Sequence, residues 1–505
     1  SSSLDSTSRE RLALAPPAPT RVGKKGEKKN ETEKEKLLRA RMKELQSKLD
    51  LEQHRKKEQA KASHDVRASR GRLVVCTPRL PYRIERNDDG RLVVGAPSSR
   101  LAAYEHISRL DVTWVGCPGG DEEIGDDEKE GLAAELREVG CVPVYVDPGL
   151  LAEAEGISGE VLWPLFHYIP LSMLDCDTDV IHQRWPAYEA VNAAYTRAVV
   201  AQKMTAGDLV WVHDFQLMVL PRMLREALPK LKIGWFLHTP FPSSEIYQTL
   251  PLRKEIMRGV LAADLVGFQI YDYVRHFMNA CSRVLSTDIN VDSKYILDAP
   301  GSMALADGKT RTAVAVDAFP SGIDQARFER MLSSPELHTK LGELERRFDG
   351  KRLILGVDRI DYVKGIPHKL LAFEKFLHNN PQEAGKLILV QIAPPPKKDT
   401  VRYQKLRNKV HKLVGRINGR FGTLEHSPIH YLDRAISFCE LCALYLMADV
   451  ALITSLREGM SKVAFEFIAC QEIAQGDGFA AAASTSEKAG TAPAASPRLG
   501  VLILS

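Results

Sequence analysis

Long apolar runs, a signal-like start and dense cysteines are all missing from this sequence. No stretch reaches about 18 consecutive apolar residues, the length that a transmembrane helix needs. The first residues, SSSLDSTSRERLALAPPAPT, lack the basic-then-apolar order of a secretory signal. The eight cysteines are scattered over 505 residues, unlike the disulfide framework of a small secreted domain. We therefore expect a cytoplasmic protein with free thiols and without a membrane as a partner.

Motifs for metals and for phosphate loops are also missing. Cys439 and Cys442 form one C-x-x-C, but no second pair or nearby histidine set completes a zinc site. Their spacing fits helix packing better. The glycine-rich GCPGGDEE at 116–123 is followed by acidic residues instead of a helix with lysine. We predict neither a metal site nor a P-loop.

The chain has neither an initiator methionine nor an ordinary ending. Its last residues, GVLILS, have the composition of a buried strand, and a domain rarely ends on a central strand. The preceding residues 472–498 are rich in Ala, Ser, Gly and Thr, which indicates a flexible surface insertion. We expect a piece of a longer protein, with further elements after residue 505.

Charge is concentrated at one end of the chain. Residues 1–70 contain 19 Lys/Arg and 11 Asp/Glu, so the remaining residues carry a net charge of −4 beneath an overall +4. Because the main body lacks a basic excess, nucleic acid is not predicted as a partner. Residues 30–62 predict a charged helix with one narrow apolar stripe, either a solvated extension or a partner contact.

Short aliphatic runs alternate with helical stretches from residue 71 onward. Leu73–Cys76, VTWVG, CVPVYV, DLVWVHD, KIGWFLH and ADLVGFQ read as strands, interleaved with helices such as 191–203. The pattern restarts with RLILGVDRIDYVKG and continues through KLILVQIA, IHYLD and DVALITS. This order is typical of doubly wound parallel α/β sheets. We predict an extension over 1–70 and two Rossmann-like domains, over 71–325 and 326–505, facing a cleft.

Polar residues directly follow several of these strands. Arg359 and Lys364 share the loop after RLILGV, where they could clamp a diphosphate or pair with neighbouring aspartates. Asp214 follows DLVWVH and His238 follows KIGWFL, as cleft residues or as satisfied core residues. Glu458 stands where DVALITS gives way to a helix. It could cap that helix, or belong to a ligand site beside the helix N–H groups.

The surroundings of three other candidates are less specific. Arg79 follows the first strand and is expected in a loop. Tyr168 and Trp185 lie beside loops, and aromatic residues there pack more often than they bind, although their polar groups can hold a sugar or a phosphate.

Seven motifs together resemble one family. They occur in the order RLVVCTPRLP, LWPLFHY, WVHDFQLMVLP, FLHTPFPSSEIYQTLP, VDRIDYVKGIPHKLLAFEKFL, GRINGRFGTLEHSPIHYL and LREGMSKVAFEFIACQ. Across residues 72–505 the chain is similar to the alpha,alpha-trehalose-phosphate synthases of glycosyltransferase family 20. The resemblance implies two Rossmann-like domains (GT-B architecture) and retaining transfer of glucose from UDP-glucose to glucose 6-phosphate, with no metal or other cofactor.

The resemblance also implies roles for single positions. Arg359 and Lys364 match the basic pair on the nucleotide diphosphate, and Glu458 takes the place of an acid, usually Asp, on the donor glucose. Backbone amides of the donor loop and one ribose carboxylate complete the donor site: Gly459, Met460, Ser461 and Glu466. His238 matches a donor-glucose contact and Asp214 an acceptor contact. The acceptor phosphate is expected at Arg79, Tyr168, Trp185 and Lys397.

Several positions depart from the family pattern. Ser99 and Arg100 stand where the family has two glycines whose amides approach the donor phosphate, and neither residue tolerates that approach as glycine does. Lys397 replaces an arginine and loses its bidentate geometry. An active synthase and a sugar-phosphate-sensing regulatory subunit therefore both stay open. A homo-oligomer or a complex of synthase with phosphatase, formed through the N-terminal helix, is the expected protein partnership.

Overall fold

The computed structural model describes most of the chain from Gly71 onward. The described residues are 71–97, 111–119, 124–173, 177–205, 207–285, 289–290, 295–297, 313–395, 401–475 and 500–504. Residues 70–505 form one compact unit. The predicted extension over 1–70, Ser99, Arg100, Lys397 and nearly all of the insertion at 472–498 lie outside the described residues. Among the helices that are described, none combines the length and the apolar character needed to cross a membrane.

The first lobe is built on a ten-stranded sheet with a parallel centre. Its strand order is β4-β3-β1-β5-β6-β7-β10-β9-β8, and β2 pairs with β1. Neighbours from β4 to β10 run parallel, whereas β2, β9 and β8 pair in the antiparallel direction. The strands span β1 (Arg72–Arg86), β2 (Leu92–Pro97), β3 (Asp111–Gly119), β4 (Cys141–Pro143), β5 (Leu209–His213), β6 (Lys232–Phe236), β7 (Leu265–Phe268), β8 (Ile289–Asn290), β9 (Tyr295–Leu297) and β10 (Ala313–Ala318).

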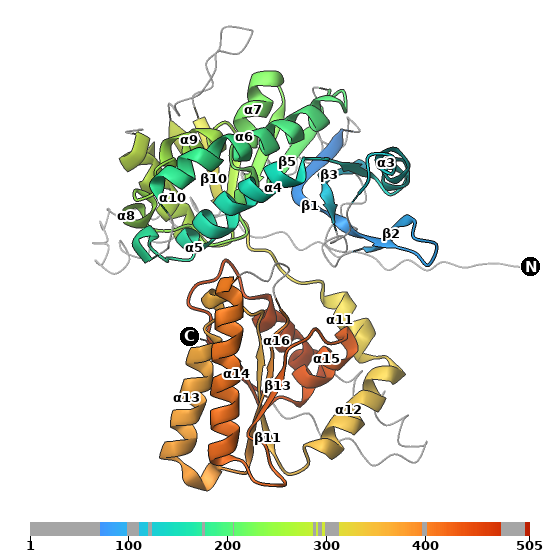
Figure 1. Cartoon of the computed structure of the whole chain (residues 1–505), viewed down its shortest axis with the longest axis vertical. Helices are drawn as coiled ribbons and strands as arrows, with labels where there is room; N and C mark the ends of the chain where they lie inside the picture. The colour runs from blue at the N-terminus through green and yellow to red at the C-terminus, as the bar shows by residue number, and fades with distance from the viewer. Residues whose placement is uncertain are drawn as a thin grey trace, which may run out of the picture. The chain divides into compact units, whose positions relative to one another are not determined.

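Helices connect these strands (Figure 1). Their apolar sides are buried in the core of the first lobe. They are α3 (Lys129–Glu138), α4 (Pro148–Glu155), a π-helix (Gly156–Leu162), α5 (Trp163–Phe166), α6 (Thr178–Val200), α7 (Leu220–Ala227), α8 (Ser244–Tyr247), α9 (Arg253–Val260) and α10 (Tyr271–Leu285). The core residues Val210, Val212 and Trp235 have at most 1% exposure. Parallel strands covered on both faces require such continuous apolar runs.

The second lobe has a smaller, fully parallel sheet with strand order β13-β12-β11-β14-β15. Its strands are β11 (Arg352–Val357), β12 (Leu387–Ile392), β13 (Ile429–Leu432), β14 (Val450–Ile453) and β15 (Val501–Leu504). Helices α13 (Ile366–Asn379) and α14 (Val401–Phe421) lie on one face, and α11 (Gln325–Leu332), α12 (Pro335–Arg347), α15 (Phe438–Met447) and α16 (Lys462–Gln475) on the other (Figure 1). The predicted doubly wound α/β class is confirmed in both lobes.

Two local predictions were wrong, and one predicted helix exists with other bounds. Arg79 lies inside β1, not in a loop, because the strand continues past a register shift after Cys76 and pairs Arg79 with Cys117 of β3. The predicted helix 191–203 begins at Thr178, where the Asp177 side chain accepts from the Asp179 N–H at 3.1 Å, and it ends at Val200. The strand β15 exists but is not buried, since β14 is its only neighbour among the described strands and Val501 is 56% exposed.

Cys439 and Cys442 lie on α15 and are buried in the core of the second lobe. The helix-packing interpretation of their spacing is therefore confirmed. The boundary between the lobes near residue 325 stays a prediction.

Candidate functional site

A cleft of about 1630 Å³ is lined by residues of both lobes. Parallel strands of each sheet end at this cleft, as expected for doubly wound sheets. Eight of the thirteen residues predicted from sequence line it: Arg79, Asp214, His238, Arg359, Lys364, Glu458, Gly459 and Met460.

The loop after β11 presents two cations to the cleft. Arg359 is exposed, whereas Lys364 is half-buried at the end of a short 3₁₀ turn, Tyr362–Lys364. The Asp361 side chain accepts from the Val363 N–H at 3.2 Å and so caps this turn. Gly365 ends the turn with φ at +62°, a conformation that favours glycine. A Cβ at that position would also lie 2.1 Å from the Thr454 carbonyl oxygen.

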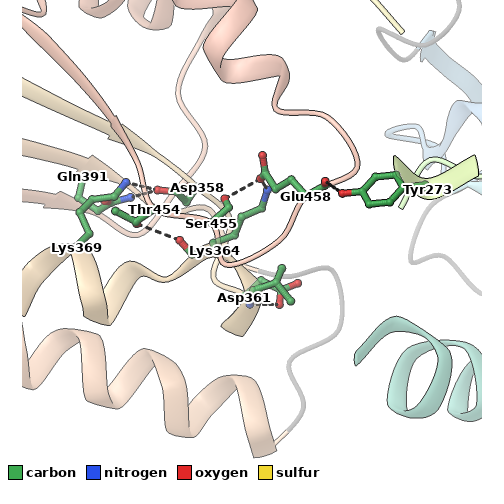
Figure 2. A network of polar contacts seen from close by, with 10 residues as sticks. Tyr273, Asp358, Asp361, Lys364, Lys369, Gln391, Thr454, Ser455 and Glu458 are labelled. Carbon is green, nitrogen blue, oxygen red and sulfur yellow. Dashed lines mark hydrogen bonds and ion pairs between the residues drawn. The ribbon is translucent and has the colours of Figure 1, made fainter. Parts of the chain in front are cut away.

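A buried ion pair lies beneath this loop. Lys369 Nζ lies 2.5 Å from Asp358 Oδ2, and their side chains are 0% and 4% exposed. Gln391 Nε2 donates to the same carboxylate oxygen at 3.2 Å (Figure 2). Because Asp358 directly precedes Arg359, this cluster holds the start of the basic loop against the sheet.

Glu458 pairs with Lys364. The Lys364 ammonium donates to Glu458 Oε1, which also accepts from the Ser455 hydroxyl at 2.8 Å (Figure 2). Burial lowers the pKa of Lys364, although the nearby Asp358 opposes this effect. Helix α16 begins only at Lys462. The Glu458 carboxylate therefore belongs to a polar cluster in the cleft, where its partners are the side chains of Lys364 and Ser455.

The loop after β14, which carries Glu458 and Gly459, also touches the first lobe closely. At Gly459, a Cβ would lie 1.9 Å from the carbonyl oxygen of His238. Only glycine allows this approach of two backbones. The loop carrying Glu458 therefore lies directly against the end of β6.

Two histidines meet where β5 and β6 end. His213 Nδ1 lies 3.0 Å from His238 Nε2, and the rings stack with centroids 5.1 Å apart. His213 is buried, whereas His238 is exposed to the cleft. The interaction with His213 orients the His238 ring, which reaches into the cleft.

Asp214 has an unusual backbone. Its φ is +74° and its ψ 174°, a conformation that non-glycine residues seldom adopt. Its N–H donates to the Phe236 carbonyl at 2.8 Å. Its buried Oδ1 has no hydrogen-bond partner among the described residues. Backbone strain together with an unused acceptor in a cleft points to a ligand-binding residue.

The remaining predicted residues lie elsewhere or are already paired. Arg79 lines the cleft but donates to Glu155 Oε1 at 3.0 Å. The Tyr168 hydroxyl forms a hydrogen bond with His276 Nδ1 at 2.8 Å. Trp185 is buried in the core and stacks on Tyr188 at 5.1 Å. Glu466 Oε2 accepts from the Tyr445 hydroxyl at 2.8 Å.

Ser461 follows Met460 immediately before α16 and is not among the residues that line the cleft. The roles predicted for these residues stay predictions.

Other cleft residues were not predicted. His167 lies in the wall of the cleft, and its Nδ1 contacts the Trp163 carbonyl at 2.7 Å. Burial lowers the pKa of His167 to about 4, and the charges of Lys364 and Arg359 add to this effect. Arg402 at the start of α14 also lines the cleft, with its guanidinium 4.6 Å from the ring centroid of Tyr362. The position of His167 inside the LWPLFHY motif was the available sequence signal.

No group of three or more His, Cys, Asp or Glu side chains suited to a metal ion occurs in the part of the chain that is described. The expectation of a metal-independent reaction stays a prediction.

Two Rossmann-like lobes with a cleft at the strand ends define the GT-B class of glycosyltransferases. The profile of glycosyltransferase family 20 matches residues 71–505, and the chain belongs to this family. A relative from Arabidopsis thaliana, named alpha,alpha-trehalose-phosphate synthase [UDP-forming] 1, is 44% identical over 81% of this chain. The alignment covers 42% of that relative, so the chain spans less than half of its length.

Two further proteins support the assignment. The alpha,alpha-trehalose-phosphate synthase [UDP-forming] of Schizosaccharomyces pombe is 44% identical over 79% of this chain and 76% of its own. A solved UDP-forming synthase from Burkholderia xenovorans, in complex with glucose-6-phosphate, matches with a TM-score of 0.63 and 26% identity. That match covers 79% of this chain and 82% of the other.

Proposed function

We propose that this chain transfers glucose from UDP-glucose to glucose 6-phosphate with retention of configuration, giving trehalose 6-phosphate and UDP. The observation that carries the proposal is the convergence of Arg359, Lys364 and Glu458 with His238 and Asp214 on one cleft. Relatives named as UDP-forming trehalose-phosphate synthases, one of them solved with glucose-6-phosphate, support the choice of donor and acceptor.

Arg359 and Lys364 hold the diphosphate of the donor. When the bond between the anomeric carbon and the diphosphate breaks, positive charge develops on the carbon and negative charge on UDP. Cations preorganised in a cleft stabilise that leaving group. The carboxylate of Glu458 balances the charge of the half-buried Lys364 ammonium.

Glu458 and His238 hold the donor glucose. A carboxylate accepts hydrogen bonds from sugar hydroxyls, and amides of Gly459, Met460 and Ser461 donate to sugar and phosphate oxygens. Glu466 holds the ribose. His238 approaches the sugar from the first lobe.

Asp214 holds the acceptor glucose, and Arg79, Tyr168, Trp185 and Lys397 hold its phosphate. The acceptor oxygen attacks the anomeric carbon on the face from which UDP departs. The carbon–oxygen bond to UDP breaks as the new glycosidic bond forms, and the departing phosphate oxygen takes the acceptor's proton. No protein nucleophile is required, so holding the two substrates in register supplies much of the rate.

The other proposed properties follow from the sequence. The reaction is metal-independent and takes place in the cytoplasm. Residues 71–325 form the acceptor domain, and 326–505 form the nucleotide-sugar domain. The helix predicted for residues 30–62, which lie outside the described residues, contacts a protein partner, in a homo-oligomer or a complex of synthase with phosphatase.

The test is UDP release from UDP-glucose by the full chain, with and without glucose 6-phosphate. We expect release that depends on glucose 6-phosphate, with trehalose 6-phosphate as the product, which would also show that Ser99 and Arg100 are tolerated. Saturable UDP-glucose binding without turnover would contradict the proposal and favour a regulatory sugar-phosphate sensor. No binding at all would refute both.

A further inference from the structure

Tyr273 links the first lobe to the donor loop of the second. It lies near the start of α10, and its hydroxyl donates to the backbone carbonyl of Glu458 at 2.6 Å (Figure 2). The tyrosine is 6% exposed. Burial raises the pKa of Tyr273 to about 12, so the hydroxyl keeps its proton at neutral pH and remains a donor.

Four consecutive residues of the donor loop, Arg457–Met460, each contact the first lobe or the segment that follows it. The Arg457 guanidinium lies 4.6 Å from the ring centroid of Tyr168. Glu458 accepts from Tyr273, and Gly459 packs on the His238 carbonyl. Met460 Sδ lies 3.9 Å from the Ser321 hydroxyl. Among these contacts, the one from Tyr273 is the shortest hydrogen bond.

Glu458 is therefore held at two points. Its side chain contacts Lys364 and Ser455, which belong to the second lobe. Its backbone carbonyl is held by Tyr273, which belongs to the first lobe. A flexible carboxylate can approach a sugar hydroxyl in many geometries, so fixing its backbone reduces the number of orientations available to it.

We infer that Tyr273 is a positioning residue for the donor sugar, whose hydrogen bond to the Glu458 carbonyl holds that carboxylate where the glucose binds. This inference rests on the proposed function, in which Glu458 binds the glucose hydroxyls. Tyr273 acts through Glu458 and does not itself contact the substrate. It should therefore affect the part of the binding energy that comes from glucose, and not the part that comes from UDP.

The experiment measures Kd for UDP and for UDP-glucose by calorimetry on the full chain. The variant Tyr273→Phe removes one hydroxyl and keeps the buried ring. The control, Tyr271→Phe, changes the same atom on the same helix at a residue that is 51% exposed. We expect Tyr273→Phe to weaken UDP-glucose binding about 3- to 10-fold, the range for one hydrogen bond, with UDP binding unchanged. Tyr271→Phe should change neither.

The double variant separates positioning from a merely structural role. Glu458→Ala should by itself remove the part of the UDP-glucose affinity that comes from the Glu458 carboxylate. If Tyr273 acts through Glu458, adding Tyr273→Phe to Glu458→Ala should cost no further affinity. Equal weakening of UDP and UDP-glucose in Tyr273→Phe, no weakening, or full additivity in the double variant would each overturn the inference.

The two proposals can fail separately. If the unmodified chain binds UDP-glucose but transfers no glucose, the proposed reaction fails, while the binding comparison still decides the role of Tyr273. If the unmodified chain binds UDP but gains nothing from the glucose, Glu458 has no sugar to bind, and the inference is refuted by that measurement alone.

Discussion

Replacing Gly459 by alanine should disable the donor site without unfolding the protein. The added Cβ would lie 1.9 Å from the His238 carbonyl oxygen, and Cβ contacts under 3.0 Å are essentially never observed. The neighbour is backbone, which cannot swing aside as a side chain can. The donor loop must therefore move by about 1 Å or more relative to His238. A displacement of about 1 Å at a reacting centre can lower a rate about 100-fold.

The assay is steady-state UDP release with UDP-glucose varied at saturating glucose 6-phosphate. We expect kcat/KM for UDP-glucose to fall about 100-fold in Gly459→Ala, with a far smaller change in UDP affinity. Gly415→Ala on α14 is the matched control, because an added Cβ there meets nothing within 4 Å. That control should keep full activity and gain about 0.5–1 kcal/mol in the free energy of unfolding, since alanine favours helix over glycine. A Gly459→Ala enzyme with more than half of the normal kcat/KM would refute this reasoning.

Three further predictions concern charged and titratable groups. Arg359→Ala should weaken UDP binding at least 10-fold, the effect of losing a charge-assisted hydrogen bond; unchanged UDP affinity in calorimetry would refute the diphosphate assignment. Lys369→Met leaves the carboxylate of Asp358 buried without its ammonium partner, so the free energy of unfolding in urea should fall by about 3–5 kcal/mol. The double variant Asp358→Leu with Lys369→Met should recover most of that loss, and a loss below about 1 kcal/mol in the single variant would contradict the argument. His167 has a folded-state pKa of about 4 and an ordinary value of 6.5, so between these pH values the unfolded chain takes up a proton that the folded chain does not. Stability should therefore fall as pH drops through this window; His167→Gln should show a smaller drop in Tm between pH 7 and pH 5, and an equal drop would count against it.

Sequence patterns predicted the layered fold because parallel strands buried on both faces are continuous aliphatic runs. They also located the polar residues that follow β5, β6, β11 and β14, since the carboxyl ends of parallel strands open on a ligand site. Arg79 was misplaced because the strand was predicted to end at Cys76, whereas a register shift lets β1 continue. The local sequence pattern could not show the continuation of β1, because the register shift depends on pairing with the neighbouring strand β3.

Long-range polar contacts were beyond the reach of sequence patterns. Tyr273 lies on the apolar face of α10, so the sequence pattern predicts a core residue. Its hydrogen-bond partner, the Glu458 carbonyl, is 185 residues away in the sequence. Lys369 likewise occupies a buried position of α13, and its partner Asp358 lies in the preceding strand-end loop. In each case the polar atom is satisfied by tertiary structure, which hydrophobic periodicity does not encode.

The contacts of Arg457–Met460 bear on how this molecule can be divided or recombined. A second lobe produced alone would keep Arg359 and Lys364. Its donor loop would lack the contacts that Tyr168, Tyr273 and His238 of the first lobe make with it. Such a fragment should bind nucleoside diphosphates while discriminating poorly among the sugars attached to them. A chimera that joins lobes from two relatives would need matching residues at these contacts, because recognition of the sugar depends on both lobes.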